Sequence, residues 1–330
     1  MPMPTSGSAA NTAKDGTPES VSPDFSLARA APQRALFPRS HIMIKRLLPL
    51  AALIALIAGC ATESHTPGTG SSFKGPVGLQ LYSLRAQFTR SVPAAIEQTR
   101  ALGFRNVELA GTYNQSPEKF REQLVAAGLN PVSAHFPYER YRDNPEGVAK
   151  DAKALGLKYA GLAWIPHKGD FTEQGCREAA AVFNHAGEVL AREGIRFFYH
   201  VHGYEFQPHA SGTLLDLLFA ETNPKYVTYQ MDTTWVFFPG QDPVALLRKY
   251  PGRWELMHLK DLKKGVARGS LSGGTDPNND VVLGTGQLDW SAILKTARET
   301  GVKWYFIEDE AATAPTQIPE SLKYLENVRW

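Results

Sequence analysis

The sequence predicts an α/β fold, a single-domain (β/α)8 TIM barrel, on three observations. Between residues 76 and 330, short apolar runs alternate eight times with amphipathic stretches, as strands alternate with helices. The roughly 255 residues of this region match the usual length of such a barrel. Glycine directly follows five of the expected helices, which is common at helix C-termini. An open doubly wound sheet is the alternative, but no GxGxxG motif follows the first expected strand.

The expected elements follow one another in regular order. Apolar runs predict strands over residues 77–83, 106–110, 131–136, 158–164, 195–201, 226–232, 254–259 and 303–308. Amphipathic stretches predict helices over residues 92–102, 117–127, 146–155, 173–193, 213–220, 243–249, 290–300 and 319–328. The glycines that close helices are Gly103, Gly128, Gly156, Gly194 and Gly301. A long loop rich in Gly, Asn and Asp follows the seventh strand.

Composition narrows the classes of function. The chain has 330 residues, of which 43% are hydrophobic and 21% charged, as in ordinary globular proteins. Two cysteines are too few for a disulfide scaffold or a thiolate zinc site. The net charge is +2, and six basic but only three acidic residues lie within residues 1–59, so the remaining chain is almost neutral. A nucleic-acid partner is therefore excluded, because such proteins present a basic face.

The first 60 residues have the composition of a targeting segment rather than of a folded domain. Residues 1–42 are rich in Pro, Ser, Ala and Thr, and they predict a disordered extension upstream of Met43. Residues 43–60 have the three parts of a secretory signal: Lys45 and Arg46, an apolar run, and small residues before Cys60. Residues 61–75 predict a flexible polar tether.

The small residues before Cys60 resemble a bacterial lipobox, which implies that this cysteine is lipidated and anchors the protein to a membrane. We therefore expect a periplasm-facing lipoprotein of the bacterial cell envelope. Ala61, rather than Asp, follows the cysteine, which favours the outer over the inner membrane. An ordinary signal with an incidental cysteine is the alternative.

Polar side chains lie at or near the end of nearly every expected strand, where such barrels carry their active sites. These residues are Gln80, Tyr82, Glu108, His135, Trp164, His200, His202, Asp232, His258, Lys260, Asp261 and Glu308. Carboxylates and imidazoles gathered at one barrel mouth would repel or carry a large desolvation cost unless a cation neutralises them. Carboxylate and imidazole ligands without thiolates favour Mn²⁺, with Zn²⁺, Co²⁺, Fe²⁺ and Mg²⁺ as alternatives. Such an ion can bind sugar oxygens and polarise a carbonyl while a nearby base moves a proton.

Five segments together resemble the xylose isomerase-like TIM-barrel superfamily, specifically its sugar phosphate isomerase/epimerase proteins. They are Tyr199-His200-Val201-His202, Met231-Asp232-Thr233-Thr234-Trp235, His258-Leu259-Lys260-Asp261, residues 283–290, and Trp304-Tyr305-Phe306-Ile307-Glu308-Asp309. The resemblance covers residues 76–330. It implies a metal site formed by His200, Asp232, His258 and Glu308. Epimerases of this superfamily carry Glu on the fifth strand, where this chain has His200, so their pair of opposed glutamates is lost.

The resemblance implies a metal-dependent sugar isomerase or epimerase, with a keto-glycoside lyase or dehydratase and a non-catalytic sugar-binding lipoprotein as alternatives. We expect Glu308, His200 and His135 to act in catalysis. Flat aromatic rings suit the apolar faces of sugars, and we expect a substrate site formed by Gln80, Tyr82, Glu108, Trp164, His202, Glu205, Trp235 and Lys260. The expected partner is a small unphosphorylated sugar, and the sequence is compatible with a homo-oligomer.

Overall fold

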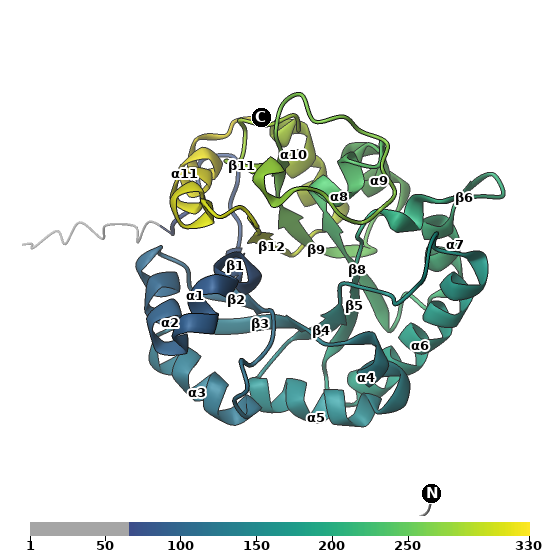
Figure 1. Cartoon of the computed structure of the whole chain (residues 1–330), viewed down its shortest axis with the longest axis horizontal. Coiled ribbons are helices and arrows are strands. Elements are labelled where there is room, and N and C mark those ends of the chain that lie inside the picture. Colours follow the sequence, from purple (N-terminus) through teal and green to yellow (C-terminus); the bar gives the residue numbers. More distant parts are fainter. Residues whose placement is uncertain (1–65) are drawn as a thin grey trace, which may run out of the picture. The chain divides into compact units, whose positions relative to one another are not determined.

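The computed structural model describes residues 66–330, and within them eight parallel strands close into a barrel (Figure 1). In spatial order these strands are β1 (Val77–Gln80), β2 (Asn106–Leu109), β3 (Asn130–His135), β4 (Tyr159–Leu162), β5 (Arg196–His200), β8 (Val227–Asp232), β9 (Trp254–Leu259) and β12 (Trp304–Ile307). β12 pairs with β1 and closes the ring. The predicted fold class is therefore confirmed.

The eight expected helices surround the barrel (Figure 1). They are α2 (Val92–Ala101), α3 (Pro117–Ala126), α5 (Pro145–Leu155), α6 (Glu173–Arg192), α7 (Leu214–Glu221), α9 (Pro243–Lys249), α10 (Trp290–Thr300) and α11 (Ala314–Asn327). α11 begins five residues earlier than the sequence predicts and contains Pro319. The sequence places Pro319 at the start of this helix, because the first turn is where a helix tolerates a residue without a backbone N–H. In the structure, Pro319 instead lies inside the helix.

Several short elements were not predicted. They are η1 (Leu81–Leu84), α1 (Arg85–Arg90), α4 (Tyr138–Asp143), η2 (Tyr204–Phe206), α8 (Thr233–Phe237), η3 (Pro277–Asn279), and the hairpins β6 (Pro208–His209) with β7 (Gly212–Thr213) and β10 (Asp261–Leu262) with β11 (Asp280–Val281). The first strand ends at Gln80 because its side chain accepts a hydrogen bond from the backbone N–H of Tyr82 and turns the chain into η1.

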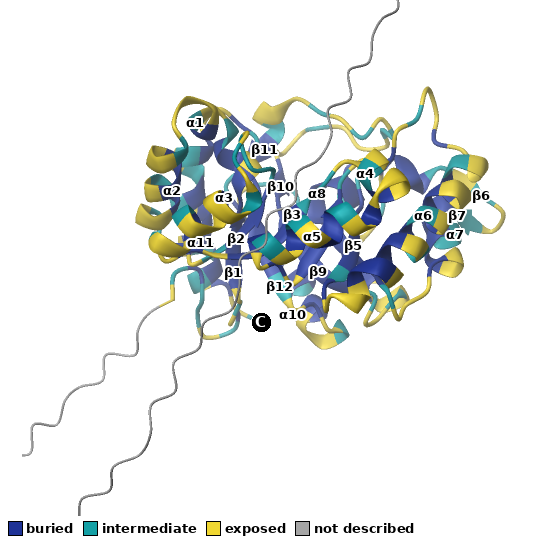
Figure 2. Ribbon diagram, turned by 90° about the horizontal axis from the view of Figure 1, so that it is seen from below, coloured by how far each residue is buried: buried dark blue, intermediate teal, exposed yellow. Residues whose placement is uncertain are grey.

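Two layers of side chains fill the barrel. The lower layer is apolar and includes Tyr159, Phe198, Leu256 and Phe306. Figure 2 colours most of the barrel strands as buried. Strand side chains alternate between the two faces, so the residue two positions further along points the same way. On β5, β9 and beyond β12 those residues are His200, His258 and Glu308, so the polar site lies directly above an apolar plug.

The last part of the expected tether packs against the barrel instead of remaining free. Phe73 is only 3% exposed, and its ring lies edge-on to Tyr305, with the ring centres 5.0 Å apart. The backbone N–H of Gly68 donates a hydrogen bond to Glu326. The expectation of a free tether was therefore wrong for this part of the chain. Burial of the apolar Phe73 ring is favourable and holds the segment against the barrel.

The predicted extension (residues 1–42), the signal peptide (43–60) with Cys60, and the first part of the tether lie outside the described residues. Within residues 66–330, no helix combines the length and the apolar character needed to cross a membrane.

Candidate metal centre

Asp232, His258 and Glu308 converge at the carboxyl ends of β8, β9 and β12. Nδ1 of His258 lies 3.1 Å from Oε2 of Glu308 and 3.6 Å from Oδ2 of Asp232. One oxygen of Asp232 accepts a hydrogen bond from the backbone N–H of Trp235 and so caps α8. Within residues 66–330 the other, Oδ2, is buried without a hydrogen-bond partner. A buried carboxylate oxygen that accepts no hydrogen bond is suited to bind a cation.

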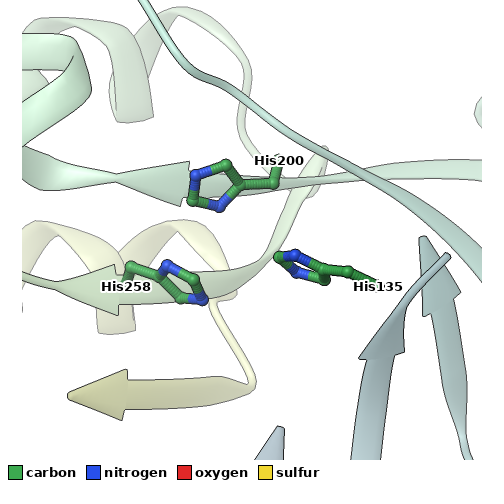
Figure 3. Close-up of side chains that lie close together, drawn as sticks. All are labelled: His135, His200 and His258. Atoms are coloured by element: carbon green, nitrogen blue, oxygen red, sulfur yellow. The ribbon is translucent and has the colours of Figure 1, made fainter. Parts of the chain in front are cut away.

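His200 joins the same cluster from β5. Its ring centre lies 4.6 Å from that of His258, and its Nδ1 lies 2.9 Å from Oε1 of Gln230. His135, His200 and His258 bring one ring nitrogen each within 4.8 Å of one another (Figure 3), as do the ligand atoms of Asp232, His258 and Glu308. The two groups share His258. Of the four expected metal ligands, Asp232, His258 and Glu308 fall in one group, whereas His200 falls in the other with His135.

The electrostatics of these imidazoles differ. Burial lowers the pKa of His200 well below its usual range, so this ring is neutral and its lone pair is available to a metal. Burial opposes a charge on His258 as well, but the carboxylates of Glu308 and Glu108 outweigh it and raise its pKa.

Glu108, on β2, links the cluster to side chains from β1, β3, β8 and β9. This carboxylate is fully buried, and five side-chain groups lie within hydrogen-bonding distance of its two oxygens. They are Nε2 of Gln80 (2.7 Å), Oγ of Ser133 (2.6 Å), Nε2 of Gln230 (2.8 Å), Nε2 of His258 (2.5 Å) and Nε2 of His135 (3.1 Å). The bond to Nε2 of His258 leaves Nδ1 facing Asp232 and Glu308. A carboxylate that fixes the tautomer of a metal-binding histidine is a common supporting feature of metal sites.

A cavity of about 340 Å³ opens above the cluster. Lys260 forms part of its wall although the residue is only 1% exposed. Its ammonium group pairs with Glu310, and it lies 3.4 Å from Oε2 of Glu308 and 3.5 Å from Oδ2 of Asp280. Burial opposes the charge of Lys260, but the three carboxylates raise its pKa.

Eight of the predicted site residues line this cavity: Gln80, Tyr82, His135, His200, His202, Trp235, Lys260 and Glu308. Glu108 lies outside the lining and acts through its neighbours. Trp164 is 42% exposed, and its ring stacks on His167.

Glu205 is placed differently from our expectation. It is fully buried outside the cavity lining, where it accepts hydrogen bonds from the Tyr199 hydroxyl and from the backbone N–H groups of His202 and Gly203. These bonds hold the turn after β5, because the carboxylate lies five residues beyond the strand and folds back on it. Glu205 therefore stabilises the turn after β5 and does not line the substrate site.

Sequence reasoning missed Gln230, Ser133, Asp280 and Glu310. Gln230 lies two residues before Asp232 on β8, so the alternation of strand side chains could have found it. Asp280 comes from the long loop after β9, where no sequence pattern distinguishes it from its polar neighbours.

A closed parallel barrel with clustered metal-ligand side chains at its carboxyl ends defines the class of this protein. The chain belongs to the xylose isomerase-like TIM barrel family, which it matches over residues 96–328. Inosose dehydratase of Clostridium tetani (strain Massachusetts / E88) is 28% identical over 243 residues, or 65% of this chain and 80% of that protein. Inosose dehydratase of Clostridium botulinum (strain Alaska E43 / Type E3) is 25% identical over 244 residues, or 66% of this chain and 81% of that protein.

Solved structures share the fold. A sugar phosphate isomerase/epimerase from Parabacteroides distasonis ATCC 8503 superposes with a TM-score of 0.65 at 22% identity, covering 79% of this chain and 97% of that one. The IolI protein with a bound zinc atom superposes with a TM-score of 0.57 at 13% identity, covering 76% of this chain and 94% of that one.

Proposed function

We propose that this protein is a divalent-metal-dependent enzyme that removes a proton next to the carbonyl of a sugar or keto-sugar and then eliminates a neighbouring oxygen substituent. The observation that carries the proposal is the different chemistry of the two sides of the site. Glu308 follows β12, whereas His135 and His200 end β3 and β5, each three strands away around the ring of eight. A carboxylate therefore faces imidazoles across the barrel.

Asp232, His258 and Glu308 would hold the ion, with His200 as the expected fourth ligand. Oδ2 of Asp232, which is buried and accepts no hydrogen bond from a described residue, supports this assignment. Two carboxylates and two imidazoles without a thiolate favour Mn²⁺, and the zinc in the IolI structure makes Zn²⁺ the alternative. A bound divalent ion supplies open positions for the carbonyl and an adjacent hydroxyl oxygen of the substrate and polarises the carbonyl.

Two side chains carry out the two proton transfers, Glu308 as the base and His135 as the acid. Glu308 is the carboxylate placed to accept the proton from the carbon next to the carbonyl. Its hydrogen-bonding distance to Lys260 and His258 holds the pKa of Glu308 well below its usual range despite burial, so this carboxylate is ionised. His135, on the other side, can give a proton to the departing oxygen.

A site with a carboxylate on one side and imidazoles on the other suits elimination better than epimerisation. In elimination the two groups have different tasks, since one takes a proton from carbon and the other gives a proton to oxygen. The dehydratase names of the sequence relatives support this choice. Isomerisation or epimerisation is the second candidate, favoured by the sugar isomerase/epimerase with the same fold.

A two-part experiment tests the proposal. Metal content is measured by mass spectrometry for the purified protein and for His258→Ala, with Glu139→Gln, an exposed surface change, as control. The Mn²⁺-loaded protein is then incubated in D₂O with a panel of keto-sugars and keto-inositols and followed by NMR. We expect bound metal only in the parent and control, and a dehydrated product. Deuterium at a retained carbon with a new epimer would instead identify an epimerase, and metal-free parent protein would support a sugar-binding lipoprotein.

A further inference from the structure

A second cavity, of about 450 Å³, opens beside the first and shares Ala110 and His135 with it. It lies over the turns after β2 and β3. Carbon atoms form most of its wall, from Leu109, Pro117, Ala134, Phe136, Pro137 and Leu155. We call this space the side pocket. Of the residues that line the side pocket, the proton transfer described above uses only His135.

Three polar side chains complete the side pocket. Arg140 pairs with Asp151 at 2.9 Å, and its guanidinium group lies 5.5 Å from the ring centre of Phe136. Oε1 of Gln115 is buried and accepts no hydrogen bond from any described residue. The side pocket therefore suits a flat apolar group that stacks on Phe136 and donates one hydrogen bond to Gln115.

The first cavity has room for about one sugar ring, since binding cavities of roughly 300 Å³ are at the small end for ligands. We propose that the side pocket binds an apolar aglycone, so that the substrate is a glycoside of a keto-sugar. This inference rests on the proposed function. The sugar ring would lie over the metal ligands and the aglycone in the side pocket, with the bond between them beside His135, which borders both.

The chemistry of this step balances without a redox partner. The C–H bond next to the carbonyl breaks and its proton goes to the base, and the electron pair forms a C=C bond. The C–O bond to the aglycone breaks, and the departing oxygen takes a proton, for which His135 is the adjacent donor. In a pyranoside whose aglycone leaves from C1, the carbonyl must be at C3 and the acidic proton at C2. The products are an unsaturated keto-sugar and an alcohol or phenol.

The side pocket can be filled without touching the metal ligands. Thr112 lines the side pocket but not the first cavity, so Thr112→Trp places a large ring there. Gln115→Leu is a second variant, which removes the unpaired oxygen at nearly constant size; because a phenyl group has no hydrogen-bond donor, this variant should keep or raise the preference for a phenyl over a methyl aglycone. Thr89→Trp is the control, because Thr89 is exposed on α1 and lines neither cavity. Circular dichroism and thermal melting establish that each variant is folded.

The probes are methyl and phenyl 3-keto-β-D-glucopyranoside, incubated with the Mn²⁺-loaded full chain and followed by NMR. Release of methanol or phenol gives kcat/KM for each. We expect Thr112→Trp to lower the phenyl-to-methyl ratio of kcat/KM at least about tenfold, because a phenyl ring loses its buried surface. Thr89→Trp should leave the ratio unchanged. The intrinsic difference in reactivity between the two leaving groups is the same for every variant, so it cancels when the ratios of different variants are compared.

Other outcomes overturn the inference in distinguishable ways. If Thr112→Trp and the control share the parent's ratio, the side pocket binds no aglycone, while the proposed elimination stands. If the keto-glycosides are not cleaved but keto-inositols are dehydrated, the substrate is not a glycoside and the proposed function stands. If neither class reacts, the inference fails together with the proposed function.

Discussion

Oε1 of Glu108 lies 2.5 Å from Nε2 of His258, and both side chains are fully buried. The bond joins β2 to β9 across the barrel and sets which nitrogen of His258 faces Asp232 and Glu308. Glu108 is thus a positioning residue for the candidate metal centre.

Glu108→Gln should weaken metal binding about 10- to 100-fold, because a metal ligand loses the group that orients it. Isothermal titration with Mn²⁺ and Zn²⁺ measures the change, with Glu139→Gln as the surface control. Unchanged affinity in a folded Glu108→Gln protein would contradict the role assigned to Glu108.

His200→Glu should keep the metal and add a carboxylate across the barrel from Glu308. With carboxylates on both sides, a proton can be taken from one face of the substrate and returned to the other. We expect new epimer formation with deuterium uptake in D₂O, detected by NMR. His200→Gln, which adds no base, is the matched control and should form no epimer.

Lys260→Met should destabilise the metal-free protein by about 3–5 kcal/mol, because three carboxylates lose their buried cation. Urea unfolding in the presence of EDTA measures the free energy of unfolding. A second change, Glu310→Gln, should restore part of the loss by removing one of the unpaired charges. Lys323→Met, at an exposed ion pair, should cost no more than about 1 kcal/mol. Equal stability of Lys260→Met and the parent would refute this account.

Asp216 gives a pH-dependent prediction far from the metal centre. Burial opposes its charge, but hydrogen bonds from Lys249, Tyr250 and the backbone N–H of Thr213 lower its pKa. A lowered pKa in the folded state adds stability above the unfolded value near 4, and this stability is lost as the pH falls through the folded value.

Asp216→Asn should therefore lower the free energy of unfolding by about 1 kcal/mol at pH 7. The gap to the parent should shrink as the pH falls below about 4. Urea titrations between pH 3 and pH 7 test this, with Asp170→Asn at an exposed loop position as control. A gap that stays constant over this range would show that ionisation of Asp216 plays no part.

Lipidation of Cys60 stays a prediction from the sequence. In a bacterial host, the protein should partition into the detergent phase of Triton X-114 and incorporate labelled palmitate. Cys60→Ser should remove both properties, whereas Cys176→Ser should remove neither, because Cys176 is fully buried in α6. Detergent partitioning of the Cys60→Ser protein would show that another segment anchors the chain.

The sequence by itself determined the barrel, because alternating apolar and amphipathic runs report local periodicity, and nearly all strand and helix bounds agree within a few residues. The positions of His200, Asp232, His258 and Glu308 at strand ends predicted a metal site, and Asp232, His258 and Glu308 come together in the structure while His200 joins His135 and His258. The sequence misplaced Glu205, whose side chain folds back to hold its own turn.

Only the tertiary structure decided which residues support that centre. Glu108 and His258 are 150 residues apart, and Lys260 meets Asp280 only because the β10–β11 hairpin brings the long loop back. Such contacts arise when a sheet closes into a ring and inward-facing positions of distant strands share one interior. Local periodicity carries no record of these contacts, because they depend on register and closure across the whole barrel.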